Sequence, residues 1–192
     1  MSRGAGVTRA RLMEVAEWMA DKQGFEGVTI HGLAAAFGVK APSLYNHVTG
    51  LPEIRDALRL RGVTLLTERL TAASDGDRGA AGRLMAMGRA VRAFAQEHPG
   101  LYTAALPTVS APETEPALAN AGERTLAILA GLIGEFGLVG EDALHATPAV
   151  RSAIHGFITL EAAGAFGMGI DVDQSFDWML RMLATGLDGL SQ

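Results

Sequence analysis

The twenty residues from Thr29 to Val48, TIHGLAAAFGVKAPSLYNHV, constrain the local fold more than any other part of this 192-residue chain. Apolar residues at positions 30, 33, 34 and 37 recur with the spacing of one helical face, which predicts a helix of about two turns. Thr29 can cap its start by accepting from free N–H groups. Gly38 then suits the left-handed backbone that ends a helix and turns the chain.

A second helix should begin near Lys40 to Pro42, because proline is tolerated in a first helical turn. Leu44 and Val48, four residues apart, can both face the core. The other side chains then point wholly or partly outward, and they offer hydroxyl, amide, imidazole and small apolar groups to phosphates, base edges and thymine methyls in a DNA groove. This outward surface consists of Ala41, Pro42, Ser43, Tyr45, Asn46 and His47.

Spacing alone leaves two functions open, because a pair of helices around a tight turn also occurs as ordinary packing in helical proteins. The first is a DNA-binding helix–turn–helix. The second is a helical interaction module that binds no DNA.

Charge is divided unevenly along the chain. Residues 1–70 carry nine Lys or Arg against seven Asp or Glu, a balance of +2, whereas residues 71–192 carry seven against fourteen, a balance of −7. A mildly basic head on an acidic body is compatible with DNA binding through few phosphate contacts, and it predicts a modest salt dependence. Arg9 and Arg11, near the start of the first expected helix, are either phosphate contacts or solvated surface.

Composition excludes several other classes of protein. The absence of cysteine rules out disulfides, thiolate metal sites and cysteine nucleophiles, and makes a reducing compartment the simplest assumption. No apolar run is long enough for a signal peptide or a membrane span, so we expect a cytoplasmic protein.

The remaining pattern predicts an all-α protein of about nine helices, because no stretch alternates like a strand. A break rich in glycine and small polar residues, SDGDRGAAG at 74–82, separates two predicted domains. Besides the two helices already described, helices are expected at about 8–22, 51–73, 80–97, 98–106, 115–136, 141–166 and 173–190.

Residues 6–66, with GVKAPSLYNHV as the recognition helix, resemble the amino-terminal DNA-binding domain of the TetR family of one-component transcriptional regulators. Residues 150–187 resemble a TetR subgroup whose ligand domain is named for a Trp-His-Gly motif. His155 and Gly156 match its last two letters, but Arg151 or a close neighbour stands in place of the tryptophan. The resemblance implies a helix–turn–helix domain at 6–66, with the motif at 29–48, and a ligand-binding and dimerisation domain at 75–192.

The same resemblance implies repression of transcription that a small, mostly apolar molecule relieves, and a homodimer on double-stranded operator DNA. Lys40 is added to the implied DNA contacts for its charge and Thr29 for a phosphate. Leu51 stands where tetracycline repressors carry a basic residue, so one phosphate contact is in doubt. The DNA contacts that the resemblance implies are His31, Ala41, Pro42, Ser43, Tyr45 and His47.

In this family the last two helices pair with those of a second subunit, and apolar stripes here are wide enough for that bundle. The alternative for each such residue is the core of the protomer itself. The predicted interface residues are Ile154, Phe157, Ile158, Ala162, Phe176, Leu180, Leu183 and Leu187. Methionine and aromatic residues in the second domain suit an adaptable ligand cavity, or else ordinary core. The candidate pocket residues are Met85, Phe94, Tyr102, Leu126, Leu129, Ile133, His155 and Trp178.

Catalysis is not expected. The five histidines show no metal-ligand spacing, and neither a nucleophile elbow, a phosphate loop nor a dinucleotide fingerprint occurs. We therefore expect no cofactor and no metal. A metal sensor would have to gather its ligands from distant helices.

Overall fold

The structure is a computed structural model, and it describes residues 6–76, 78–106, 116–167 and 169–190. Over these residues it contains eight α-helices and two 3-10 helices and no strand, which confirms the predicted all-α class. The chain forms two compact units, one from residues up to Leu66 together with Glu97–Gly122, the other from Thr67–Gln96 and Glu123–Gln192. Of the described helices, none is both long and apolar enough to cross a bilayer.

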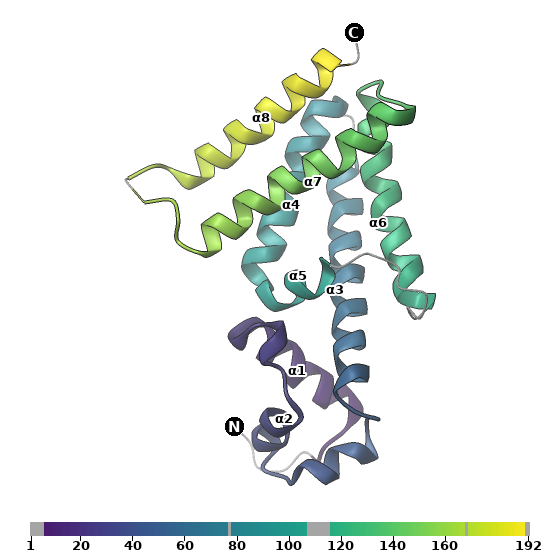
Figure 1. Ribbon diagram of the computed structural model, residues 1–192, viewed down its shortest axis with the longest axis vertical. Coiled ribbons are helices and arrows are strands. Elements are labelled where there is room, and N and C mark those ends of the chain that lie inside the picture. The colour runs from purple at the N-terminus through teal and green to yellow at the C-terminus, as the bar shows by residue number, and fades with distance from the viewer. Residues whose placement is uncertain (1–5, 77, 107–115, 168, 191–192) are drawn as a thin grey trace. The chain divides into compact units, whose positions relative to one another are not determined.

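The first unit contains the predicted helix–turn–helix (Figure 1). Leu12, Leu33 and Leu44 are fully buried and form the centre of its core. Thr29 caps the second helix as predicted, since its hydroxyl accepts from the N–H of Gly32 at 3.1 Å. Its elements are α1 (Arg9–Gln23), η1 (Phe25–Gly27), α2 (Ile30–Phe37), η2 (Ala41–Asn46), the first part of α3 (Leu51–Ser74) and α5 (Pro99–Ala105).

The segment expected as a second α-helix is instead the 3-10 helix η2. The backbone N–H of Ser43 donates to the carbonyl of Lys40 at 2.9 Å, and the backbone N–H of His47 donates to the carbonyl of Leu44 at 2.9 Å. Both acceptors lie three residues back, which is the 3-10 pattern. Six residues make few hydrogen bonds of any kind, so the α-helical pattern does not become established. The position of the helix was predicted; its type was not.

Helix α5 packs on the end of α1, although the sequence break at 74–82 placed it in the second predicted domain. One oxygen of Asp21 accepts from the backbone N–H of Gly100 at 3.0 Å and of Leu101 at 3.3 Å, and the other lies 3.0 Å from Nδ1 of His98. A carboxylate at this point satisfies N–H groups that a helix start leaves free. The division into domains at 6–66 and 75–192 remains a prediction, and the compact units divide the chain differently.

The second unit is built on apolar side chains from four helices, with Phe94 on α4, Ile133 on α6, Ile158 on α7, and Phe176 and Leu180 on α8 buried. Helices α7 and α8 form an antiparallel hairpin, green and yellow in Figure 1. Besides the end of α3, its elements are α4 (Gly79–Glu97), most of α6 (Pro116–Glu135), α7 (Gly140–Ala162) and α8 (Val172–Leu190).

Helix α7 ends at Ala162, four residues before the predicted end at Phe166. Gly164 takes a left-handed φ of 68°. The N–H of Ala165 then reaches back to the carbonyl of Leu160 at 2.9 Å. This is the usual way in which a glycine terminates a helix. The predicted start of the helix at 115–136 lies outside the described residues.

A substitution at Gly100 tests the packing of α5 on α1. A Cβ at this position would lie 2.1 Å from the carbonyl carbon of Ala20, which is backbone and cannot give way. We expect Gly100→Ala to lower the free energy of unfolding by about 2 kcal/mol or more, in urea titrations followed by circular dichroism. Gly131→Ala is the control, because open space surrounds Gly131 on α6 and alanine favours helices there. Equal midpoints for the two variants would contradict the packing.

Candidate nucleic-acid interface

The exposed side of η2 follows from the burial of its other side. Leu44 is completely buried and Val48 almost so, as their four-residue spacing predicted. Tyr45 between them is 56% exposed. Of the nine predicted DNA contacts, Ala41 and His47 are half-buried, and the exposed ones are Thr29, His31, Lys40, Pro42, Ser43, Tyr45 and Asn46.

A tight turn fixes η2 against α2. Gly38 takes a left-handed φ of 67°, as its place after the apolar stripe predicted. The N–H of Gly38 donates to the carbonyl of Ala35 at 3.1 Å, and the N–H of Val39 donates to the carbonyl of Ala34 at 3.0 Å. These bonds satisfy two of the carbonyls that the end of α2 would otherwise leave free. The two helices therefore form a compact helix–turn–helix whose outer face is polar and accessible.

The carboxylate of Glu53, near the start of α3, closes the other end of η2. Glu53 accepts from the N–H of Thr49 at 2.6 Å and from its hydroxyl at 2.9 Å, and it is ion-paired with Arg9. The hydrogen bond from the backbone of Thr49, followed by that from Arg9, lowers the pKa of Glu53 to about 2. A threonine shortly before a glutamate at a helix start is the sequence signal for such a cap.

Several other arginines of the first unit are also paired with its carboxylates. Arg55 contacts Glu26 at 2.8 Å, Arg59 contacts Asp56 at 2.8 Å, and Arg61 lies 3.7 Å from Glu17. Burial raises the pKa of Glu17, against the opposing effect of Arg61. Cations engaged in this way contribute less to a phosphate-binding surface, which agrees with the few phosphate contacts expected from the charge balance.

The predicted pocket residues do not form one group. Phe94 and Ile133 are buried in the second unit, and Met85, Leu129 and His155 are half-buried there. Tyr102 is buried in the first unit, on α5. Leu126 and Trp178 are 41% and 60% exposed, and their place in a ligand pocket stays a prediction.

The predicted interface residues divide by helix face. Ile154, Ile158, Phe176 and Leu180 are buried within the protomer, and their place in a dimer interface stays a prediction. The ring of Phe157 also packs inward, 5.0 Å from that of Phe176. An apolar stripe shows only that a helix face is buried, not by which chain. Ala162 is exposed, Leu183 is half-buried, and Leu187 is buried.

Helices α7 and α8 nevertheless share an accessible apolar groove of about 350 Å³. Asp142 and His145 are its polar members, and Leu183 and Leu187 belong to it. Trp178 and Met182 on α8 are exposed, on the opposite side of the helix from Phe176 and Leu180. The groove is lined by Leu138, Asp142, His145, Ala146, Ala149, Val150, Met182, Leu183, Gly186, Leu187 and Leu190.

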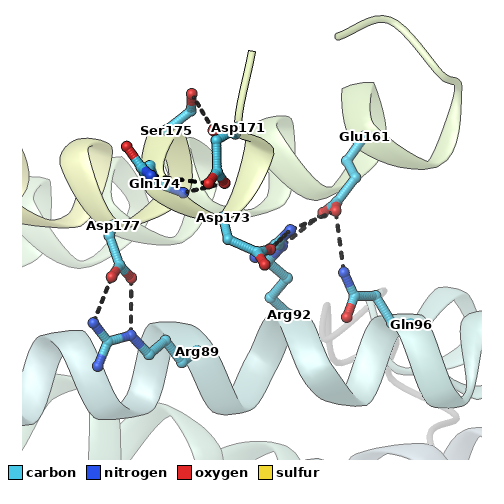
Figure 2. Close-up of polar contacts among 9 residues, drawn as sticks. All are labelled: Arg89, Arg92, Gln96, Glu161, Asp171, Asp173, Gln174, Ser175 and Asp177. Carbon is cyan, nitrogen blue, oxygen red and sulfur yellow. Dashed lines mark hydrogen bonds and ion pairs between the residues drawn. The ribbon is translucent and has the colours of Figure 1, made fainter. Parts of the chain in front are cut away.

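Ion pairs fasten α4 to the turn end of this hairpin (Figure 2). Arg92 makes two hydrogen bonds to Glu161, at 2.6 and 2.7 Å, and contacts Asp173 at 2.7 Å. Its guanidinium also lies 5.0 Å from the ring centre of Phe176. The hydrogen bonds from Arg92 lower the pKa of Glu161. Because Arg92 is only 12% exposed, this contact is shielded from water and holds α4 to both helices.

A second pair extends this attachment along α4. Arg89 binds both carboxylate oxygens of Asp177, at 2.6 and 2.8 Å, and lowers its pKa. Gly88 lets α4 approach α8 closely, because a Cβ at this position would lie 2.6 Å from the side chain of Leu180. Among the described residues no three His, Cys, Asp or Glu side chains gather as a metal site would require.

A small helix–turn–helix with a polar reading face, joined to a larger helical unit, defines the class of one-component DNA-binding regulators. Residues 84–183 match the family model described as the tetracyclin repressor-like C-terminal domain. An uncharacterised helix–turn–helix-type transcriptional regulator of Bacillus subtilis, YobS, is 35% identical over 97% of this chain and 96% of its own length. A similar regulator of Mycobacterium tuberculosis is 33% identical over 98% of this chain and 85% of its own length.

Solved structures agree in fold. A Rhodococcus protein of unknown function has a TM-score of 0.79 at 24% identity, over 98% of this chain and 99% of its own. A TetR variant from Acinetobacter baumannii in complex with minocycline has a TM-score of 0.68 at 20% identity, over 97% and 99% of the two chains. The chain belongs to the TetR family of DNA-binding transcriptional regulators.

Arg92 and Arg89 offer a comparison between a shielded and an exposed ion pair. We expect Arg92→Met to lower the free energy of unfolding by about 2 kcal/mol, because Glu161 loses its main partner in a half-buried position. Arg89→Met, at a position 55% exposed, should cost less than about 1 kcal/mol. Urea titration at neutral pH measures both. An equal loss in the two variants would show that shielding from water does not strengthen the Arg92 contacts.

Proposed function

We propose that this chain is a transcriptional repressor that binds operator DNA as a homodimer and leaves it when a small, mostly apolar molecule binds in the second unit. The observation that carries this proposal is the helix–turn–helix with Tyr45, Asn46 and Ser43 exposed on its outer face. A repressor acts where the chromosome is, so we place the protein in the cytoplasm. Its family is one of regulators, and we assign it no catalytic step.

Sequence recognition would come from η2 in the major groove, with Tyr45 and Asn46 toward base edges or phosphates and Ala41 and Pro42 against thymine methyls. A single short helix reads too few base pairs for useful specificity. Two heads, about 34 to 36 Å apart, would read one half-site each on the same side of the duplex.

A second copy of the chain is the occupant that we propose for the groove between α7 and α8. Exposed Trp178 lies one helical turn before the groove residue Met182 on α8, so the apolar surface extends beyond the groove itself. Two such hairpins brought together would make a four-helix bundle. These accessible residues lie on the same two helices as the buried residues of the first prediction.

Release would follow from a ligand that prefers the form of the protein unable to bind DNA. The minocycline complex is a property of the Acinetobacter protein. For this chain we propose an apolar site near the half-buried Met85, Leu129 and His155 of the second unit. A preference of a few kcal/mol between the two forms shifts operator occupancy by two or more decades.

Tyr45→Ala tests DNA binding. We expect it to weaken operator binding by tenfold or more, since one good base or phosphate contact contributes roughly 1–3 kcal/mol. A gel shift with the promoter region next to the gene measures the affinity, and size-exclusion chromatography should show an unchanged dimer. Trp18→Ala is the matched control: this aromatic residue is also 56% exposed in the first unit but lies on α1. Unchanged affinity for Tyr45→Ala would count heavily against the assignment.

Met182→Glu tests the dimer. Met182 is exposed and lines the groove, and a carboxylate there would be buried without a partner when two copies meet. Sedimentation at micromolar concentration should show a dimer for the wild type and a monomer for the variant. Leu126→Glu, on the exposed part of α6, should leave the dimer intact. A monomeric wild-type protein at that concentration would refute the proposed assembly.

A further inference from the structure

The geometry of η2 depends on what flanks it. A 3-10 helix of six residues has poor hydrogen-bond geometry and too few bonds to be stable alone. Leu44 and Val48 anchor its inner side in the core, but two apolar contacts on one side leave rotation about them unopposed. The polar contacts at its ends must therefore fix which way Tyr45 and His47 point.

At the exit of η2, one carboxylate holds two segments of chain together. One oxygen of Glu53 accepts two hydrogen bonds from Thr49, from the backbone N–H at 2.6 Å and from the hydroxyl at 2.9 Å. Glu53 is the third residue of α3, so these bonds attach the turn at 47–50 to the start of that helix. A short link of this kind limits where the residues before Thr49 can lie.

The other oxygen of Glu53 is ion-paired with Arg9 at the first position of α1. The same guanidinium nitrogen of Arg9 lies 3.4 Å from the carbonyl oxygen of His47, the residue that caps η2. Arg9 therefore touches both the carboxylate and the last carbonyl of the reading segment. The start of α1, the exit of η2 and the start of α3 meet at these two side chains.

We propose that Arg9 and Glu53 are positioning residues for operator recognition: through Thr49 and the His47 carbonyl they orient η2 without themselves reading a base. This inference rests on the proposed function. It differs from the phosphate contact considered for Arg9 from the sequence, because a positioning role affects the operator more than other DNA, whereas a phosphate contact affects all DNA equally.

The sign of the effect at Glu53 separates positioning from electrostatics. Replacing Glu53 with glutamine removes a negative charge from the side of the protein that would face a polyanion, and by charge alone this strengthens binding to any duplex. If the carboxylate orients η2, the same change weakens binding to the operator. The two effects have opposite signs, so one measurement decides between them.

The probe is a 30-base-pair duplex that the wild-type protein selects from a random library, compared with a scrambled duplex of the same composition. For Glu53→Gln we expect operator affinity to fall by about tenfold or more, with affinity for the scrambled duplex unchanged or higher. Glu26→Gln is the matched control: it removes the exposed Arg55 ion pair of the same unit but does not touch the turn at 47–50. That variant should keep operator binding within about twofold of the wild type.

Circular dichroism melts show whether each variant is folded at the assay temperature, and Arg9→Ala provides a second route if Glu53→Gln is not. For Arg9→Ala, loss of operator binding with an unchanged salt slope supports positioning. A slope smaller by about one, with both duplexes weakened alike, marks a phosphate contact and overturns the proposal. Undiminished operator affinity in folded Glu53→Gln also overturns it. If the wild-type protein selects no duplex, the proposed function itself fails.

Discussion

The reading face of this protein depends on the burial of Leu44 beneath a helix too short to support itself. Six residues of 3-10 helix contribute little stability, so the inward side chains and the contacts at both ends determine where the outward ones lie. Gly38 controls the entry through its left-handed backbone. Glu53 and Arg9 control the exit. The rest of the first unit provides the core against which Leu44 packs.

In the second unit, ion pairs hold long helices against one another. Arg92 lies where three helices meet, and its contacts with Glu161, Asp173 and Phe176 join α4 to both members of the α7–α8 hairpin. Charged groups can do this because each of them has a partner. While α4 is fixed to the turn end of the hairpin, α7 and α8 also line the groove that we assign to a second copy.

Local signals in the sequence predicted local structure well. The cap at Thr29, the turn at Gly38 and the inward pair Leu44 and Val48 each depend on residues a few positions apart, and all three are confirmed. The helix type of η2 was wrong because hydrophobic spacing over six residues does not distinguish α from 3-10 geometry. DNA contact by the exposed residues stays a prediction.

Features that depend on distant residues could not be read from the chain. The carboxylate of Asp21 accepts a hydrogen bond from Gly100 at the start of α5, nearly eighty positions along the chain. No periodicity in the sequence predicts such a pairing. Stripes on α7 and α8 predicted buried faces, yet Phe176 and Leu180 turned out to be buried by their own protomer. Binary patterns indicate which face avoids water and leave the identity of the covering chain open. Arg9 was assigned to solvent or phosphate because its partner Glu53 lies 44 residues away.

Helix α3 continues without interruption from Leu51 to Ser74, through the point at which the chain passes from one compact unit to the next. Its 24 residues correspond to about 36 Å of stiff rod. A tilt of about 5° at one end of a rod of that length moves the other end by about 3 Å, which is the length of a hydrogen bond. Because Leu51 follows directly on the turn after η2, a displacement of that size at the start of α3 would carry the reading segment with it.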